Sequence, residues 1–192
     1  MKASDRAGGD VFGVSVALSE DGDTLAVGAM GKDTSAGDEG VAYVFTRSSG
    51  SWSEQDIVES ASPENNDLFG YRVALSADGT TLAVGAEQDG ATDRPPGAGA
   101  VFVYTEGPTD DWQFDQEIVQ PTPLSASRFG SALALSDAAT RWRRVRADED
   151  GRGEVHVFVR ASGHVCVPGL AGGVERRLGR SLRRGAGAVG RW

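Results

Sequence analysis

The chain is poor in the residues from which disulfides, zinc sites and histidine-based catalytic sites are built. It has one cysteine, Cys166, and two histidines, His156 and His164, among 192 residues. One thiol cannot form an internal disulfide, and the three residues do not make a tetrahedral zinc site. No serine lies in a Gly-x-Ser-x-Gly turn of the kind that exposes a hydrolase nucleophile. We therefore expect no catalytic, metal-binding or cofactor-binding residues.

Long apolar runs are also absent. No segment is apolar over the length that spans a membrane, and residues 1–6 lack the apolar core of a signal peptide. The net charge of −9 is unevenly distributed. Residues 1–136 carry seven Lys and Arg against 22 Asp and Glu, a net charge of −15, whereas residues 137–192 carry 12 Arg against six acids, a net charge of +6. The acidic part argues against nucleic-acid binding, and an Arg/Gly-rich tail could by itself indicate nucleic-acid or membrane binding.

What the chain does have is an internal repeat. Residues 12–29 return almost intact as residues 69–86, a third copy opens at Phe129-Gly130, and residues 178–182 resemble the start of a fourth. The Phe-Gly pairs lie 57 and 60 positions apart. Self-similarity at a fixed period indicates a repeat architecture.

Each repeat predicts four short strands. In the first copy we expect strands over residues 14–19, 24–29, 41–46 and 52–59, and in the second over 72–76, 81–86, 100–105 and 112–119. Asp21-Gly22 and Asp78-Gly79 predict tight type I′ hairpin turns with glycine at positive φ. No stretch has helical periodicity, and four antiparallel strands per repeat indicate a propeller blade. We predict an all-β partial β-propeller of about three blades, the third degraded.

The repeats resemble the FG-GAP family, from which the β-propeller of integrin α subunits is built, and are most similar to its bacterial version. The resemblance rests on Phe12-Gly13 with residues 27–29, on Phe69-Gly70 with residues 84–86, and on residues 40–45 and 99–104. Integrin-type repeats insert an acidic calcium loop between the first two strands. Here that junction is only residues 19–24 or 76–81, too short to supply six to eight oxygens, so we expect no calcium site.

The pattern breaks in the third copy. Residues 137–147 replace the expected second strand, the pattern resumes at residues 148–160, and it fails again after Gly163. One shifted reading frame of 137–147 restores most of the missing strand, so we interpret this stretch and much of 164–192 as out-of-frame. We expect blades at 12–68 and 69–128, an incomplete blade at 129–163, the end of a preceding repeat at 1–11, and a poorly ordered tail at 164–192. The chain is then a fragment of a longer propeller protein.

Several residues need a choice between a structural and a functional interpretation. Acidic loops recur at Asp33–Glu39, Glu87–Asp93 and Asp148–Asp150, where we favour solvated loops over a cation rim. Trp52 and Trp112 occupy the same repeat position, and we favour packing over stacking on a sugar or peptide. His156 aligns with Tyr43 and Phe102 and is interpreted as a packing residue. Gly97–Val101 resembles part of a dinucleotide loop but precedes a strand, so we discard it.

The family resemblance implies a non-enzymatic binding or adhesion-like module. Its blade loops would contact a protein or glycan, and the intact parent protein would lie at the cell surface or outside the cell. The alternatives are a propeller-type lyase or glycosidase fragment, or a decayed gene product. We also expect association through exposed blade edges.

Overall fold

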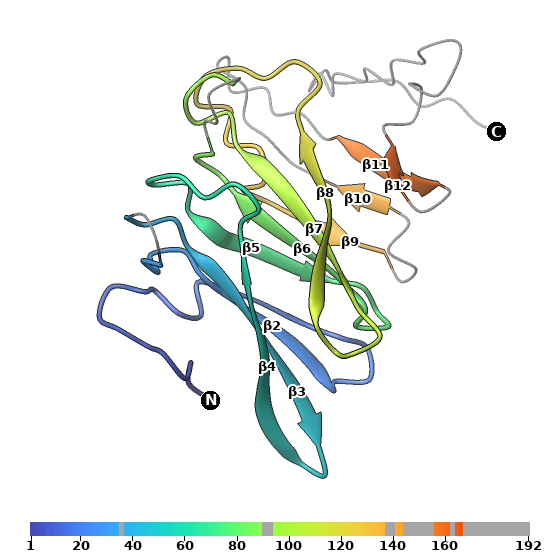
Figure 1. Ribbon diagram of the computed structural model, residues 1–192. Coiled ribbons are helices and arrows are strands. Elements are labelled where there is room, and N and C mark those ends of the chain that lie inside the picture. Colours follow the sequence, from blue (N-terminus) through green and yellow to red (C-terminus); the bar gives the residue numbers. More distant parts are fainter. Residues whose placement is uncertain (35–36, 90–93, 137–140, 144–155, 162–163, 167–192) are drawn as a thin grey trace, which may run out of the picture.

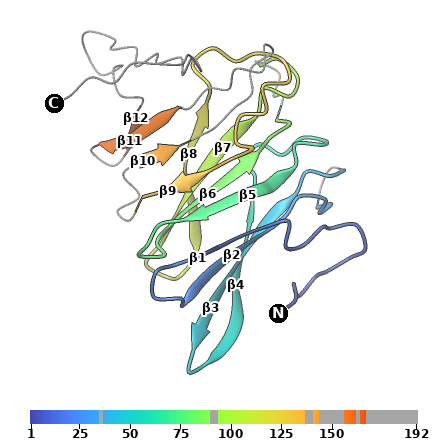
Figure 2. The same cartoon turned by 180° about the vertical axis from the view of Figure 1, so that it is seen from behind.

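The computed structural model describes residues 1–34, 37–89, 94–136, 141–143, 156–161 and 164–166, which form three four-stranded antiparallel sheets (Figures 1 and 2). The first sheet contains β1 (Ser15–Leu18), β2 (Thr24–Ala29), β3 (Val41–Ser48) and β4 (Ser51–Glu59). The second contains β5 (Phe69–Leu75), β6 (Thr81–Ala86), β7 (Ala100–Glu106) and β8 (Trp112–Val119). The third contains β9 (Ala134–Leu135), β10 (Arg141–Arg143), β11 (Val157–Ala161) and β12 (His164–Cys166).

Within each sheet the strands pair in chain order, so every connection is a simple antiparallel one. This confirms the four-strand repeat unit, with the polar fourth strand at the edge. β2 and β6 have the predicted bounds, whereas β5 starts three residues early, at Phe69, because Phe69 pairs with Ala86 across an irregularity in the ladder. The described residues contain no helix with the length and hydropathy of a membrane span.

The turns between the first two strands differ from the prediction. Gly22 and Gly79 have φ of 72° and 74°, as expected, but neither Asp21 nor Asp78 has positive φ, which type I′ requires of both central residues. Four residues separate the paired Ser19 and Thr24, and the Gly22 N–H donates to the Ser19 carbonyl at 3.0 Å. The Asp21 carboxylate instead accepts bonds from the Ser19 hydroxyl and the Asp23 N–H. The type I′ assignment was therefore wrong. The aspartate does not adopt positive φ, and its side chain stabilises the turn.

Each of the first two sheets has one face of small residues and one face of large residues. The small face of the first sheet packs against the large face of the second, and the two form one buried cluster. The small face consists of Ala17, Ala26, Ala42, Val44 and Val58, and the large face includes Val73, Leu75, Leu82, Val84, Phe102, Tyr104 and Trp112. Alternation along the strands produces the two faces, and burial of each large side chain stabilises the fold by about 1.5–3 kcal/mol.

The Phe-Gly pair sets how closely neighbouring sheets approach. Gly70 lies against Gly28 of β2, so closely that a Cβ built on Gly28 would lie 1.9 Å from the Gly70 carbonyl oxygen. Gly130 lies in the same way against Gly85, where the corresponding distance is 2.2 Å. The repeated Val-Gly-Ala and Phe-Gly motifs are thus the two halves of one contact between sheets.

A short backbone ladder also joins each sheet to the next. The N–H groups of Asn66, Leu68 and Phe69 donate to the carbonyls of residues 37, 38 and 39, at 2.8, 3.2 and 2.8 Å. The N–H groups of Ala126, Arg128 and Phe129 donate to the carbonyls of residues 96, 97 and 98, at 2.9, 2.9 and 2.8 Å. The loop before the third strand of one sheet is therefore bonded to the segment that enters the next sheet.

The third sheet continues the same packing. Phe129 and Phe158 are buried in a cluster with Ala83 and Val101 on the small face of the second sheet. Three residues of the expected poorly ordered tail, His164–Cys166, instead form β12, which pairs with β11. The remainder of that tail, residues 167–192, and the suspected out-of-frame residues 137–140 and 144–147 lie outside the described part of the chain.

Candidate functional site

The large face of the first sheet is the one described large face that no other sheet covers. Register pairs Val16 with Val27 and Leu18 with Leu25 on this face. Val16 and Leu18 are 62% and 55% exposed, while their counterparts Val73 and Leu75 in the second sheet are only 6% and 9% exposed. The sequence repeat therefore presents the same apolar surface twice, once covered and once open.

Residues 1–5 lie across part of this open face. Ala3 is buried among Val27, Tyr43 and other residues of the face. The Tyr43 hydroxyl donates to Asp5 Oδ1 at 2.6 Å, and the Lys32 ammonium donates to the Asp5 carbonyl at 2.8 Å. The bond from Tyr43 lowers the pKa of the Asp5 carboxyl, whereas burial raises the pKa of the Tyr43 hydroxyl. This segment leaves Val16 and Leu18 uncovered.

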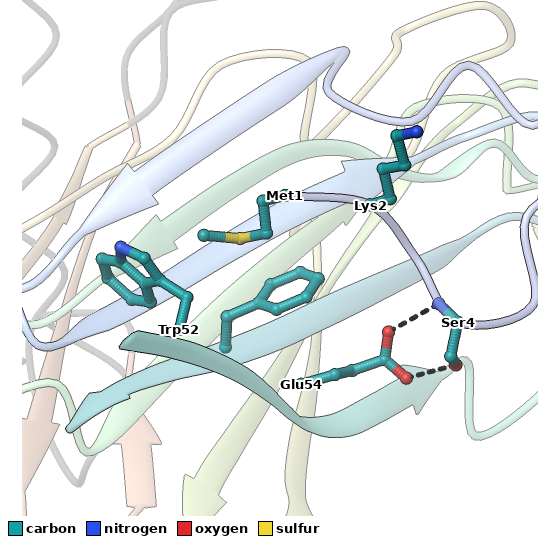
Figure 3. A pocket seen from close by; sticks show the side chains of 6 residues that line it. Met1, Lys2, Ser4, Trp52 and Glu54 are labelled. Carbon is teal, nitrogen blue, oxygen red and sulfur yellow. Dashed lines mark hydrogen bonds between the residues drawn. The ribbon is translucent and has the colours of Figure 1, made fainter. Parts of the chain in front are cut away.

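A hollow of about 390 Å³ opens beside the segment. Figure 3 shows Trp52 and Met1 at one side and Glu54 with Ser4 at the other. The Ser4 N–H and hydroxyl donate to the Glu54 carboxylate at 2.9 and 2.6 Å. The lining residues are Met1, Lys2, Ser4, Phe45, Trp52 and Glu54. The hollow thus combines two aromatic rings with one carboxylate, one ammonium and one hydroxyl group.

The two equivalent tryptophans have different environments. Trp112 is 8% exposed and belongs to the cluster between the first two sheets, which confirms its predicted packing role. Trp52 is half-buried, packs on the first sheet's aromatic cluster and also borders the hollow. The Arg47 guanidinium lies 5.8 Å from its ring centroid and is held at 2.8 Å by Asp23. Trp52 therefore packs as predicted and in addition keeps a surface that a ligand could reach.

Comparison with protein families identifies the repeat. The model described as "FG-GAP repeat" matches residues 1–45 and 52–104. The chain belongs to the FG-GAP repeat family. A comparison with curated proteins found no match.

Solved structures show the FG-GAP chain's fold class. Saccharomyces cerevisiae Sqt1 is 8% identical, with a TM-score of 0.50, over 83% of this chain and 35% of Sqt1. The Pseudomonas aeruginosa periplasmic gluconolactonase PpgL is 18% identical, with a TM-score of 0.50, over 79% of this chain and 37% of PpgL. The chain thus spans about a third of the length of each. These likenesses confirm the all-β, propeller-like fold, with each four-stranded sheet as a blade.

The acidic loops of the FG-GAP blades are bonded within the protein. Asp33 accepts the Asp38 N–H at 2.7 Å, and the fully buried Glu39 accepts the Thr34 N–H at 2.6 Å. In the second blade Asp89 lies 3.2 Å from the Arg94 guanidinium. No group of three or more His, Cys, Asp or Glu side chains among the described residues is placed to hold a metal ion. Asp148–Asp150 and residues 90–93 lie outside those residues.

One difference between the blades was not recognised from the sequence. Asp10 and Asp67 precede the Phe-Gly pair in the first and second copies, and each accepts the N–H of the residue three positions before it. Lys32 lies 3.6 Å from Asp10, but the equivalent residue of the second blade is Asp89. Burial, together with the negative charge of Asp89, raises the pKa of Asp67 to about 7. Aligning the repeats would have revealed this charge reversal, but it would not have revealed that Asp67 is buried.

His156 lies where the repeat alignment predicted it. Its ring centroid is 6.1 Å from that of Phe129 and 6.3 Å from that of Phe158. The equivalent rings Phe69, Phe102 and Tyr104 form the same kind of group in the second blade. His156 is therefore a packing residue, as predicted. Gly97–Val101 leads into β7, so its interpretation as the approach to a strand is also confirmed.

Proposed function

We propose that this FG-GAP chain is a non-enzymatic binding module, and that a protein or glycan ligand contacts the hollow beside Trp52. The observation that carries the proposal is the contrast between the two tryptophans. Trp112 is covered by the neighbouring blade, whereas Trp52, at the same repeat position, borders an open hollow of about 390 Å³. That volume lies within the range of small-ligand sites. We place such a module at the cell surface or outside the cell as part of the same proposal.

The chemistry of the lining supports this role. Trp52 and Phe45 offer ring surfaces on which the apolar face of a sugar or a peptide side chain can pack. Glu54 is held in place by Ser4 and keeps acceptor capacity, while Lys2 supplies a donor at the rim. Partly buried aromatic anchors surrounded by polar groups carry most of the free energy of binding in protein interfaces.

The test is a glycan and peptide array on the full chain, followed by titration of any ligand it identifies. We expect Trp52→Ala to weaken binding about tenfold or more, as removal of an aromatic anchor does. Leu124→Ala is the control, because Leu124 is 41% exposed and does not line the hollow. Equal affinities for the parent and Trp52→Ala would refute the site, and turnover of an array glycan would refute the non-enzymatic assignment.

A further inference from the structure

We propose that Arg72, Glu87 and Arg128 form a binding site for the carboxylate of an acidic sugar, at the corner where the second blade meets the third. The hollow of the proposed function lies against the first blade, beside Trp52, and none of these three residues lines it. The inference therefore goes beyond the proposed function and does not depend on it.

The contact between the two blades places both arginines at this corner. Arg72 in β5 pairs with Gly85 of β6, and Gly85 lies against Gly130 of the third blade. The Arg72 Nε–H donates to the Ser131 carbonyl at 3.1 Å, which joins β5 to the segment that enters β9; the two strands lie side by side (Figure 2). The Ser131 N–H in turn donates to the Arg128 carbonyl at 3.1 Å.

Glu87 is the buried member of the cluster. It directly follows β6 and is only 5% exposed. No described residue donates a hydrogen bond to its carboxylate, although buried polar groups nearly always have a partner. Burial raises the pKa of the Glu87 carboxyl, while the positive charges of Arg128 and Arg72 oppose the rise. Glu87 thus lies within the field of both guanidinium groups and keeps its hydrogen-bonding capacity for a ligand.

The corresponding corner between the first and second blades shows that the fold does not need these charges. The residues at the same three repeat positions are Ser15, Met30 and Leu68. Ser15 pairs with Gly28, as Arg72 pairs with Gly85, and its hydroxyl accepts the Val73 N–H at 3.1 Å. One corner is therefore apolar and internally bonded, whereas the other carries three charged side chains.

The two arginines also differ from most other cations of the described chain. Residues 1–136 have a net charge of −15, and Lys32, Arg47 and Arg94 each pair with a carboxylate, at 3.2, 2.8 and 3.2 Å. Among the described residues no carboxylate forms an ion pair with Arg72 or Arg128. Two guanidinium groups without a counter-ion, close together in an acidic protein, favour binding of an anion.

The orientation of Arg72 is fixed before any ligand arrives. Its guanidinium carbon lies 5.0 Å from the centroid of the Tyr71 ring, and its Nε is bonded to the Ser131 carbonyl. Its Nη2 has no partner in the described part of the chain. Arg128 is exposed. A fixed guanidinium that keeps free donors matches the planar, two-oxygen geometry of a carboxylate.

Glu87 narrows the ligand from any carboxylate to an acidic sugar. The guanidinium groups account for recognition of a carboxylate, but the Glu87 carboxyl needs a different partner, and a ligand hydroxyl is the simplest one. A uronic acid such as glucuronate carries a carboxylate and several hydroxyl groups on one small ring. An aspartate or glutamate side chain carries the carboxylate without a hydroxyl.

The experiment titrates the isotope-labelled full chain with glucuronate and follows the backbone amides of Arg72, Glu87 and Arg128 by NMR. We expect saturable shifts, and about tenfold weaker binding by Arg128→Gln, because hydrogen bonds between charged groups are lost. Arg128 is exposed and its side chain bonds to no described residue, so this variant should unfold at the parent's Tm. The matched control is Arg6→Gln, which removes the same charge from an exposed arginine outside the cluster and should bind like the parent.

Two comparison ligands test the two halves of the recognition. Glucose lacks the carboxylate, and equal affinity for glucose would refute the role of the arginines. The amide of N-acetylaspartate lacks the ring hydroxyls, and binding as tight as that of glucuronate would identify an acidic peptide as the ligand instead. Absence of saturable shifts with millimolar glucuronate, or equal affinities of the parent and Arg128→Gln, would refute the site. Trp52→Ala should bind glucuronate at this corner like the parent, so failure of this proposal and failure of the proposed function give different results.

Discussion

Substitution of Gly28 by alanine tests the contact that sets the distance between the first two blades. A Cβ at this position would lie 1.9 Å from the Gly70 carbonyl oxygen and 2.9 Å from its carbon. Gly28 does not have positive φ, so alanine introduces no backbone strain and the destabilising part of the effect comes from crowding. The oxygen cannot move freely, because the neighbouring Phe69 is fixed by its bond to the Glu39 carbonyl.

The expected cost follows from the two opposing effects. Overpacking of a close contact destabilises by about 1–3 kcal/mol, while alanine in a strand interior gains roughly 0.5–1 kcal/mol over glycine. Because the obstacle is a backbone oxygen at 1.9 Å, we take the crowding cost as about 2–3 kcal/mol. Subtracting a gain of about 1 kcal/mol leaves a net loss of about 1–2 kcal/mol in the free energy of unfolding. For a chain of this length that corresponds to a decrease of about 2–8 °C in Tm.

The assay is thermal unfolding of the full chain followed by circular dichroism, with two controls. Gly8→Ala places a methyl group in open space at ordinary φ and should leave the Tm unchanged. Gly13→Ala imposes the strain of φ 92° without crowding, and so measures the strain separately. If Gly28→Ala unfolds at the same temperature as Gly8→Ala, the close contact between Gly28 and Gly70 is refuted.

Three further predictions concern the turns, the buried carboxyl and calcium. Gly22→Val and Gly79→Val should each destabilise by roughly 1–3 kcal/mol in urea titrations, because valine is strained at positive φ; a parent-like midpoint for either variant would contradict the turn geometry. Because the folded-state pKa of Asp67 is raised from 3.8 to about 7, burial favours its protonated form, and its contribution to stability should be lost as the pH rises from about 4 to about 7. Asp67→Asn should reduce this loss of stability between about pH 4 and about pH 7. Asp10→Asn should instead destabilise the protein, because it removes a partner of Lys32. If the stability of Asp67→Asn depends on pH as that of the parent does, the raised pKa of Asp67 is refuted. Millimolar calcium should not raise the Tm, because the turns between the first two strands are too short to supply six to eight oxygens. Specific binding would stabilise the folded chain, so a rise of several degrees would show a calcium site.

The strands could be predicted from the sequence because the repeat displays each of them at least twice. Residues 24–29 and 81–86 were placed without error, since a small apolar run between a glycine turn and a loop has few alternatives. The turn type was not predicted correctly. The conformation of the turn depends on whether the side chain or the backbone of the aspartate makes the hydrogen bonds that close it. The out-of-frame interpretation of residues 137–147 remains a hypothesis, which resequencing of the locus would test.

Features that depend on contacts between blades could not be read from one copy of the repeat. The ladder from residues 37–39 to residues 66–69 joins segments that show no pairing signal in sequence. Likewise, nothing in residues 1–5 indicates that they would lie across the first sheet through Asp5 and Tyr43. The candidate hollow arises from that arrangement, so it became visible only in three dimensions.

The unequal faces of each blade have a consequence for assembly. A small face meets a large face at every described interface. The stack of blades is therefore directional, and its two ends present different surfaces. A further blade that kept this pattern would add head to tail, and heterologous contacts of that kind produce a closed ring or an open-ended filament. Which of these forms depends only on whether the rotation between successive blades completes a full circle.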